Sequence, residues 1–200
     1  MSMALERSAL KRIFEEKHTI IDIGGGVRID ESRNNRKNEN DWLLPYLSNV
    51  DYKVLDKVSD YNPDIVGDIH DLPLEDNSID AIICSSVLEH VEEPQKAVRE
   101  MYRVLKPGGY CYIYVPFLFY YHAEKGYYGD FYRFTSDGVR YMTKDFTSVE
   151  IENTHGALAT VMNLFPFFSK YRIGIFDALD RVIKKDRSEQ ASGYSVFCIK

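Results

Sequence analysis

The amino-acid sequence predicts an α/β fold: a doubly wound, mostly parallel sheet of seven strands, with helices on both faces and an antiparallel edge strand. Short apolar runs of the buried-strand type alternate with segments of helical periodicity along the 200 residues. The first run begins at Thr19 and stops abruptly at three glycines, positions 24–26, which is typical of a buried strand that ends in a tight turn. Acidic residues also stand at the ends of three successive predicted strands. In a doubly wound sheet such strand ends share one crevice, where ligands bind.

The elements of the first half follow from this alternation. Apolar side chains recur at helical spacing over residues 4–16, which predicts a helix packed against the sheet. Residues 28–41 are almost wholly polar and include four asparagines, so we expect a mobile loop, either ordered by a ligand or simply exposed. A short helix at 42–47 is expected before strands at 52–55, 65–66 and 79–84.

The second half continues the pattern and then changes strand direction. Residues 94–105 carry one apolar face and end at Lys-Pro-Gly-Gly, 106–109, a helix stop with a basic residue near the negative end of the helix dipole. A strand is expected at 110–115, followed by helices at 157–168 and 176–183. Strands at 146–151 and 194–199 flank those helices and are expected to form an antiparallel hairpin at the sheet edge. Residues 1–200 are interpreted as a single domain whose N-terminal helix lies within 1–17.

Composition and charge exclude several classes of partner and location. The net charge of −6 argues against a nucleic-acid backbone as the main partner. No apolar run approaches the length of a membrane span, and the charged N-terminus lacks the apolar core of a signal peptide. The three cysteines lie in apolar segments without metal-type spacing, which predicts buried, reduced thiols, a cytoplasmic location and no metal site. Nothing in the sequence indicates an oligomeric state.

The three carboxylates at strand ends are candidate ligand contacts. Asp56 can accept hydrogen bonds from both hydroxyls of a ribose, because an ionised carboxylate offers only acceptor sites. Asp68 can accept from an exocyclic adenine amine while the Ile69 backbone N–H donates to a ring nitrogen, and Asp22 can bind a cationic amino group directly or through water. The alternative for each aspartate is a helix cap or a turn.

The glycine run has two competing interpretations. The three glycines can serve only the geometry of their own turn, since a glycine cluster alone is a weak signal. A nicotinamide-binding turn requires G-x-G-x-x-G, and the position of its third glycine holds Ile29. The acidic partner of that motif is expected about 20 residues further on, and Asp56 lies too far from Gly26. A nicotinamide-dependent oxidoreductase is therefore disfavoured.

Six short motifs occur in an order and at a spacing that resemble one family. They are D-I-G-G-G at 22–26, V-L-D at 54–56, G-D-I with D-L-P-L at 67–74, I-D-A-I-I-C at 79–84, V-L-E-H-V at 87–91 and L-K-P-G-G at 105–109. Over residues 20–117 the chain resembles the class I S-adenosylmethionine-dependent methyltransferases of the small-molecule type, which have a Rossmann-like fold. Position 28, often a third glycine in that family, holds Arg28 here, and the D/N-P-P-Y/F motif of amino-methylating nucleic-acid enzymes is absent after the fourth strand.

The resemblance implies S-adenosylmethionine as the cofactor and assigns its contacts. They are Gly24 and Gly26 for the methionine portion, Asp56 for the ribose, Asp68 and Ile69 for the adenine, and Ser85 for the region of the sulfonium and the amino group. It further implies transfer of a methyl group to a small polar acceptor. The alternative from another class is a protein that binds an adenosyl cofactor without catalysis and acts as a sensor or partner.

Residues 116–140 are interpreted as a lid or substrate segment. They follow the fifth strand, are rich in tyrosine and phenylalanine, and can close over the crevice. His122 is the first candidate for a general base and His90 the second, because an unperturbed imidazole titrates near neutral pH. Packing by the aromatic residues, and catalysis by positioning alone, are the alternatives. Residues 130–135 (D-F-Y-R-F-T) also resemble a methyltransferase subset associated with bacterial surface-glycan clusters, which implies a sugar or glycan precursor as acceptor.

Overall fold

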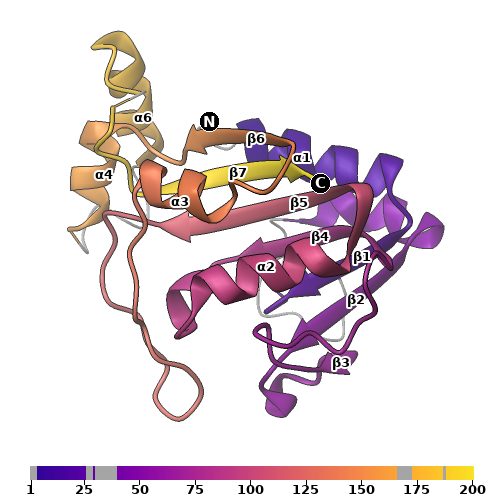
Figure 1. Cartoon of the computed structure of the whole chain (residues 1–200). Coiled ribbons are helices and arrows are strands. Elements are labelled where there is room, and N and C mark those ends of the chain that lie inside the picture. Colours follow the sequence, from indigo (N-terminus) through magenta and orange to yellow (C-terminus); the bar gives the residue numbers. More distant parts are fainter. Residues whose placement is uncertain (1–3, 26–28, 30–39, 166–172, 187) are drawn as a thin grey trace.

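The computed structural model describes residues 4–25, 29, 40–165, 173–186 and 188–200. Its centre is a seven-stranded sheet with the strand order β3-β2-β1-β4-β5-β7-β6 (Figure 1). The strands are β1 (Thr19–Ile23), β2 (Asp51–Asp56), β3 (Ile65–Val66), β4 (Ile79–Ser85), β5 (Leu105–Pro116), β6 (Ser148–Asn153) and β7 (Gly193–Ile199). Every predicted strand is present, so the predicted fold class is confirmed.

The direction of the strands divides the sheet into two parts. Strands β1 to β5 pair in parallel, with β1 between β2 and β4. Strand β7 runs antiparallel to both of its neighbours, β5 and β6. The predicted antiparallel hairpin therefore forms the β6 edge of the sheet. The parallel strands leave their carboxyl ends on a common edge, which is where a doubly wound sheet binds ligands.

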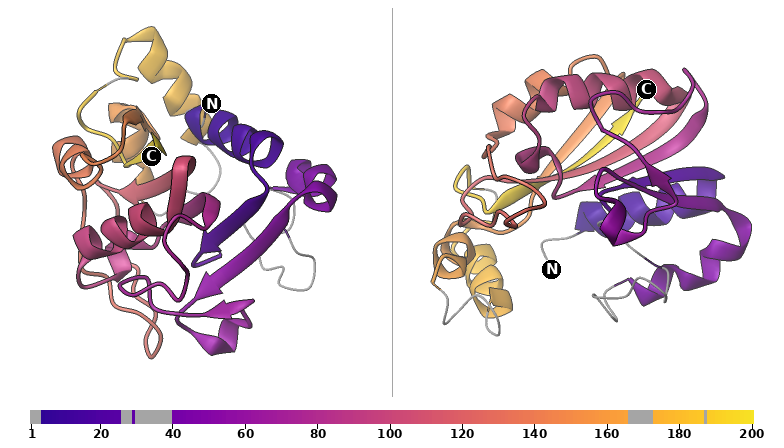
Figure 2. Two further views of the ribbon diagram at one scale, coloured as in Figure 1. Left: turned by 45° about the vertical axis from the view of Figure 1, so that its right-hand side comes forward. Right: turned by 90° about the horizontal axis from the view of Figure 1, so that it is seen from below.

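Helices cover both faces of the sheet, and alternate strand residues point to opposite faces. Ile20 and Ile83 are buried together with helix α1 (Ala4–Glu16). Ile21 and Ile82 are buried in the cluster that includes helix α2 (Pro94–Val104). Figure 2 shows these layers from two further directions. The parallel strands are apolar on both faces because both faces are covered.

The remaining helical segments were predicted only in part from the sequence. They are the 3-10 segments η2 (Asp41–Asn49), η3 (Ser59–Tyr61) and η4 (Leu88–His90) and the helices α3 (Ser136–Met142), α4 (Ala157–Asn163) and α6 (Ile173–Val182). The helix expected at 42–47 is a 3-10 helix with Pro45 inside it, where proline has no N–H to donate. Helix α4 ends before the predicted residue 168, and positions 166–168 lie outside the described residues. Helix α3 and the two short 3-10 turns were not predicted.

Some expectations concern residues that the structure does not describe, and others are confirmed by burial. Most of the predicted loop at 28–41, together with Gly26 and Arg28, lies outside the described residues. The thiols of Cys84, Cys111 and Cys198 are free and buried, as predicted. Among the helices that the structure describes, none combines the length and the apolar character needed to cross a membrane.

Candidate active site

The turn after β1 requires glycine for two independent reasons. Gly24 and Gly25 have φ angles of 74° and 61°, in the left-handed region that side chains disfavour. A Cβ on Gly24 would lie 2.5 Å from Cγ2 of Val87, closer than carbon atoms approach. The Gly24 N–H donates to the Leu55 carbonyl at 2.8 Å, which fixes the turn against the end of β2. The turn therefore presents bare backbone at the carboxyl edge of the sheet.

A cavity of about 480 Å³ opens at this edge, within the size range of small-molecule sites. Six of its lining residues were predicted from the sequence. They are Gly24, Asp56, Asp68, Ile69, Ser85 and His90. Gly24 follows β1, Asp56 ends β2 and Ser85 ends β4, so three strand ends meet at one cavity as expected. Their individual roles stay predictions.

Two predicted residues lie elsewhere in the structure. The Asp22 side chain is buried and does not belong to the described lining of the cavity. Its Oδ2 accepts a hydrogen bond from the Tyr52 hydroxyl at 2.6 Å. The predicted contact of Asp22 with a cationic amino group, directly or through water, stays a prediction. His122 also lies outside the described lining, beside His90, with ring centroids 4.8 Å apart.

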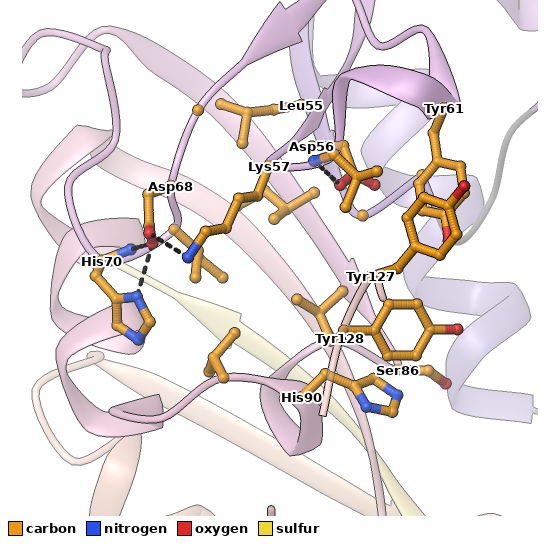
Figure 3. Close-up of a pocket in the computed structure, with 18 of the residues that line it drawn as sticks. Leu55, Asp56, Lys57, Tyr61, Asp68, His70, Ser86, His90, Tyr127 and Tyr128 are labelled. Atoms are coloured by element: carbon orange, nitrogen blue, oxygen red, sulfur yellow. Dashed lines mark hydrogen bonds and ion pairs between the residues drawn. The ribbon is translucent and has the colours of Figure 1, made fainter. Parts of the chain in front are cut away.

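The two cavity aspartates are held by different contacts. Asp56 Oδ1 accepts from the Val58 N–H at 2.9 Å, which closes a tight turn after β2. Asp68 lies between His70, whose backbone N–H and ring nitrogen Nδ1 lie 2.9 and 2.7 Å from Oδ1, and the Lys57 ammonium, 3.0 Å from Oδ2 (Figure 3). Burial raises the pKa of Asp68, but the His70 N–H, Lys57 and the His70 ring outweigh it and lower the pKa to about 2. Asp68 is therefore ionised at neutral pH.

A cluster of tyrosines and one glutamate lines part of the cavity. The hydroxyls of Tyr61 and Tyr128 each donate to Glu124 Oε2 at 3.1 Å. Tyr127 stacks on Tyr61 with centroids 5.3 Å apart, and Tyr128 packs against the His90 ring at 4.4 Å (Figure 3). Glu124, Tyr127 and Tyr128 come from the segment predicted as a lid, and Tyr61 comes from η3. These contacts connect the segment to η3, and its role as a lid stays a prediction.

His122 is held by the same segment. Its backbone N–H donates to Asp130 Oδ2 at 2.8 Å, and Asp130 also pairs with Arg133 at 2.7 Å. The Glu89 carboxylate raises the pKa of His122, burial opposes this, and the Tyr120 carbonyl and Asp130 reinforce it. The Arg133 guanidinium, acting against the effect of burial and supported by the His122 N–H, lowers the pKa of Asp130 to about 2.

Glu89 is the residue at this end of the site that sequence reasoning missed. Its side chain is 1% exposed, and its backbone carbonyl accepts from the Phe131 N–H at 2.8 Å. Neither carboxylate oxygen accepts a hydrogen bond from any described residue. A signal was present in the sequence, because Glu89 is a charged residue that directly follows the apolar pair Val87 and Leu88.

Other lining residues were also missed, and two of them follow a predicted residue closely in the chain. Lys57 comes directly after Asp56, and His70 comes two residues after Asp68. Both therefore lie within two residues of a predicted aspartate, at the same strand ends. Tyr61 carried no such signal, because only the turn at 58–62 brings it over the cavity.

Comparison with known proteins agrees with this geometry. The sequence profile of the family described as "Methyltransferase domain" matches residues 9–113, which is more than half of the chain. The chain belongs to the methyltransferase domain family. A solved relative is a SAM-dependent methyltransferase from Archaeoglobus fulgidus, with a TM-score of 0.63 and 16% identity over 100% of this chain and 95% of that one. This likeness confirms the Rossmann-like methyltransferase fold.

Curated relatives of this methyltransferase domain match it over shorter stretches. The ubiquinone/menaquinone biosynthesis C-methyltransferase UbiE of Vibrio cholerae is 35% identical over 100 residues, covering 45% of this chain and 38% of that protein. The demethylmenaquinone methyltransferase of Renibacterium salmoninarum is 56% identical over 45 residues, 22% of this chain and 19% of that protein. The chain therefore matches well under half the length of these relatives.

Proposed function

We propose that this methyltransferase domain binds S-adenosylmethionine in the 480 Å³ cavity and transfers its methyl group to a small polar acceptor. The observation that carries the proposal is the meeting of Gly24, Asp56 and Asp68 at one cavity, in a chain of the methyltransferase domain family. When bound, the cofactor supplies a methyl group on a positively charged sulfur, which is already a reactive donor. The protein then has to bind the cofactor and the acceptor, orient them and exclude water from the site.

The lining of the cavity fits the chemistry of this cofactor. Gly24 and Gly25 line the cavity and offer bare backbone to the methionine portion. Val87 leaves no room for a side chain at Gly24. The Asp56 carboxylate offers acceptors to the ribose hydroxyls. Asp68 and the Ile69 backbone, which line the same cavity, would contact the adenine. An amine at Asp68 would share that carboxylate with Lys57, which already contacts it.

The acceptor is expected at the end of the cavity lined by His90, Tyr128 and Phe131. Tyrosine faces and hydroxyls suit an acceptor that has both a ring and polar groups. We therefore place sugars and glycan precursors first, in line with the D-F-Y-R-F-T segment at 130–135. Reduced quinones form a second class, because curated relatives carry the names of quinone methyltransferases. His122 or His90 would hold the acceptor or take its proton.

An acceptor screen with isotopically labelled S-adenosylmethionine tests the proposal. The expected result is transfer of label to one acceptor class, abolished when Asp56 is replaced by alanine. Cofactor binding without transfer to any sugar, quinol or small hydroxylated metabolite would instead support a sensor that binds the cofactor without catalysis. Absence of cofactor binding would contradict the proposal itself.

A further inference from the structure

Three metal-ligating side chains converge beside the cavity. Glu89 Oε1 lies 3.8 Å from His90 Nε2 and 3.7 Å from His122 Nε2. One ligand atom from each residue lies within 4.8 Å of those of the other two. His90 also lines the cavity, so the cluster borders the space in which an acceptor is expected. Glu89 and His90 belong to η4, whereas His122 comes from the segment after β5.

The tautomers of both histidines follow from their other ring nitrogens. His90 Nδ1 lies 2.6 Å from the Gly129 carbonyl oxygen, and His122 Nδ1 lies 3.0 Å from the Tyr120 carbonyl oxygen. A carbonyl oxygen only accepts hydrogen bonds, so each Nδ1 carries the proton. In the neutral ring, Nε2 then presents a lone pair toward Glu89. A histidine that donates its second N–H to a carbonyl is the usual arrangement of a metal ligand.

Glu89 supplies the second, independent observation. Its side chain is 1% exposed, and within the described part of the chain neither of its oxygens accepts a hydrogen bond. Burying a carboxylate without partners is costly. The separations of 3.7 and 3.8 Å from the imidazoles exceed those of a hydrogen bond, so neither histidine satisfies it as a donor. The buried Glu89 carboxyl and the Nε2 atoms of both imidazoles therefore face one point.

We propose that Glu89, His90 and His122 bind one divalent first-row transition metal ion. Metal bonds of about 2.0–2.2 Å place neighbouring ligand atoms roughly 3.0–3.5 Å apart. The two separations from Glu89, 3.8 and 3.7 Å, need to shorten by only a few tenths of an ångström, whereas the largest separation in the cluster, up to 4.8 Å, needs to shorten by about 1 Å or more. Two imidazoles and one carboxylate suit zinc, iron, nickel or copper rather than magnesium, which prefers oxygen ligands. Three protein ligands leave coordination positions open.

The open positions give the ion a role at the acceptor end. Because His90 lines the cavity, an oxygen or nitrogen atom of the acceptor can complete the coordination sphere. This role rests on the proposed methyl transfer, whereas metal binding itself does not. Cysteine spacing could not reveal such a site, because its ligands are a carboxylate and two histidines from separate segments.

Calorimetric titration of the full chain, first stripped with a chelator, tests the site with Zn²⁺ as the probe and Mg²⁺ as the comparison. We expect one Zn²⁺ per chain and no comparable Mg²⁺ binding. Glu89→Gln keeps the shape of the side chain, and His122→Asn removes one imidazole. Each is expected to weaken Zn²⁺ binding by about 100-fold or more. Even replacing a residue that only hydrogen-bonds to a metal ligand typically lowers metal affinity by about 10- to 100-fold. His155→Asn is the matched control, because His155 pairs with Asp177 at 3.0 Å outside the cluster and should leave Zn²⁺ affinity unchanged.

Two further measurements report on the coordination of the metal ion directly. Co²⁺ should give the intense visible absorption of a four- or five-coordinate site, and this spectrum should be lost in Glu89→Gln. Nitrogen NMR of the imidazoles should show Nε2 of both histidines shifting on Zn²⁺ addition. Absence of stoichiometric Zn²⁺ binding, wild-type affinity in both variants, or a doubly protonated His122 that does not respond to Zn²⁺ would each overturn the proposal. Binding of S-adenosylmethionine, measured on the same metal-free samples, reports separately on the proposed function.

Discussion

Replacing Asp56 by alanine is expected to weaken S-adenosylmethionine binding without unfolding the protein. Asp56 ends β2 and lines the cavity, where its carboxylate is the candidate acceptor for the ribose hydroxyls. Hydrogen bonds to a charged group are worth about 1.5–3 kcal/mol. Loss of this interaction should raise the dissociation constant by roughly 10- to 150-fold. Isothermal titration calorimetry measures the change directly.

The structure also predicts a smaller, separable effect on folding. Asp56 Oδ1 accepts from the Val58 N–H at 2.9 Å, so alanine removes a turn hydrogen bond worth about 0.5–1.5 kcal/mol. Asp56→Asn keeps an oxygen for that bond but removes the charge. The asparagine variant should therefore lose cofactor affinity while keeping more of the free energy of unfolding, as measured by urea denaturation.

A nearby aspartate provides the control for net charge. Asp60 lies in η3, is exposed and does not belong to the described lining of the cavity. Asp60→Ala should bind S-adenosylmethionine like the wild type. If a folded Asp56→Ala protein binds with an affinity within about twofold of the wild type, less than about 0.5 kcal/mol, the ribose assignment is refuted.

Three further predictions concern the turn, the adenine end and the tyrosine cluster. Gly24→Ala should lower the free energy of unfolding by about 1–3 kcal/mol, because φ of 74° is strained for alanine and its Cβ would meet Val87; thermal denaturation measures this. Asp68→Asn should be less stable than the wild type near neutral pH, and this difference in the free energy of unfolding should become smaller as the pH falls. The folded-state pKa of about 2 is below the usual 3.8, so the stabilisation is present above about pH 4 and is lost as the pH falls toward 2, as urea unfolding at several pH values would show. Tyr61→Phe removes the hydrogen bond from the Tyr61 hydroxyl to Glu124, which joins η3 to the predicted lid, and should speed cofactor release by roughly 2- to 10-fold in stopped-flow fluorescence.

Two of these predictions have a matched control variant, and the pH series has an outcome that would contradict it. Gly138→Ala should be nearly neutral, because a Cβ there meets only Thr135 Oγ1 at an ordinary 3.4 Å; equal losses at Gly24 and Gly138 would contradict the strain argument. For the pH series, a gap between Asp68→Asn and the wild type that stays constant from pH 6 to about pH 2 would mean that the carboxylate is not stabilised by folding. Tyr46→Phe removes a similar bond to Glu15 away from the cavity, so equal release rates in Tyr46→Phe and Tyr61→Phe would count against a lid.

The sequence was most informative where local chemistry and topology coincide. Apolar runs of β-branched residues, such as Ile79 to Cys84, predicted the parallel strands because both faces of the sheet are covered. Helix α3 was missed because its seven residues carry one buried apolar side chain, Val139, which gives no periodicity. Its start depends instead on the Thr135 side chain, which accepts from the Gly138 N–H.

The residues of the candidate site were likewise predictable only where the sheet fixes their position. Strand ends are fixed by the sheet, so Gly24, Asp56 and Asp68 could be placed at one cavity from the order of the strands alone. Glu89 and His122 meet through a backbone link between η4 and the segment after β5, where the Phe131 N–H donates to the Glu89 carbonyl. Such contacts between irregular segments have no sequence period and became visible only in three dimensions.

The central claim is that this cavity binds an adenosyl cofactor, and calorimetric titration with S-adenosylmethionine, S-adenosylhomocysteine and NAD tests it most directly. We expect the first two to bind at one site with a dissociation constant of about 1 μM, a binding free energy of about −8 kcal/mol, and NAD not to bind. If neither adenosyl ligand binds the folded protein, the glycine turn serves only the fold and the account of the site is contradicted.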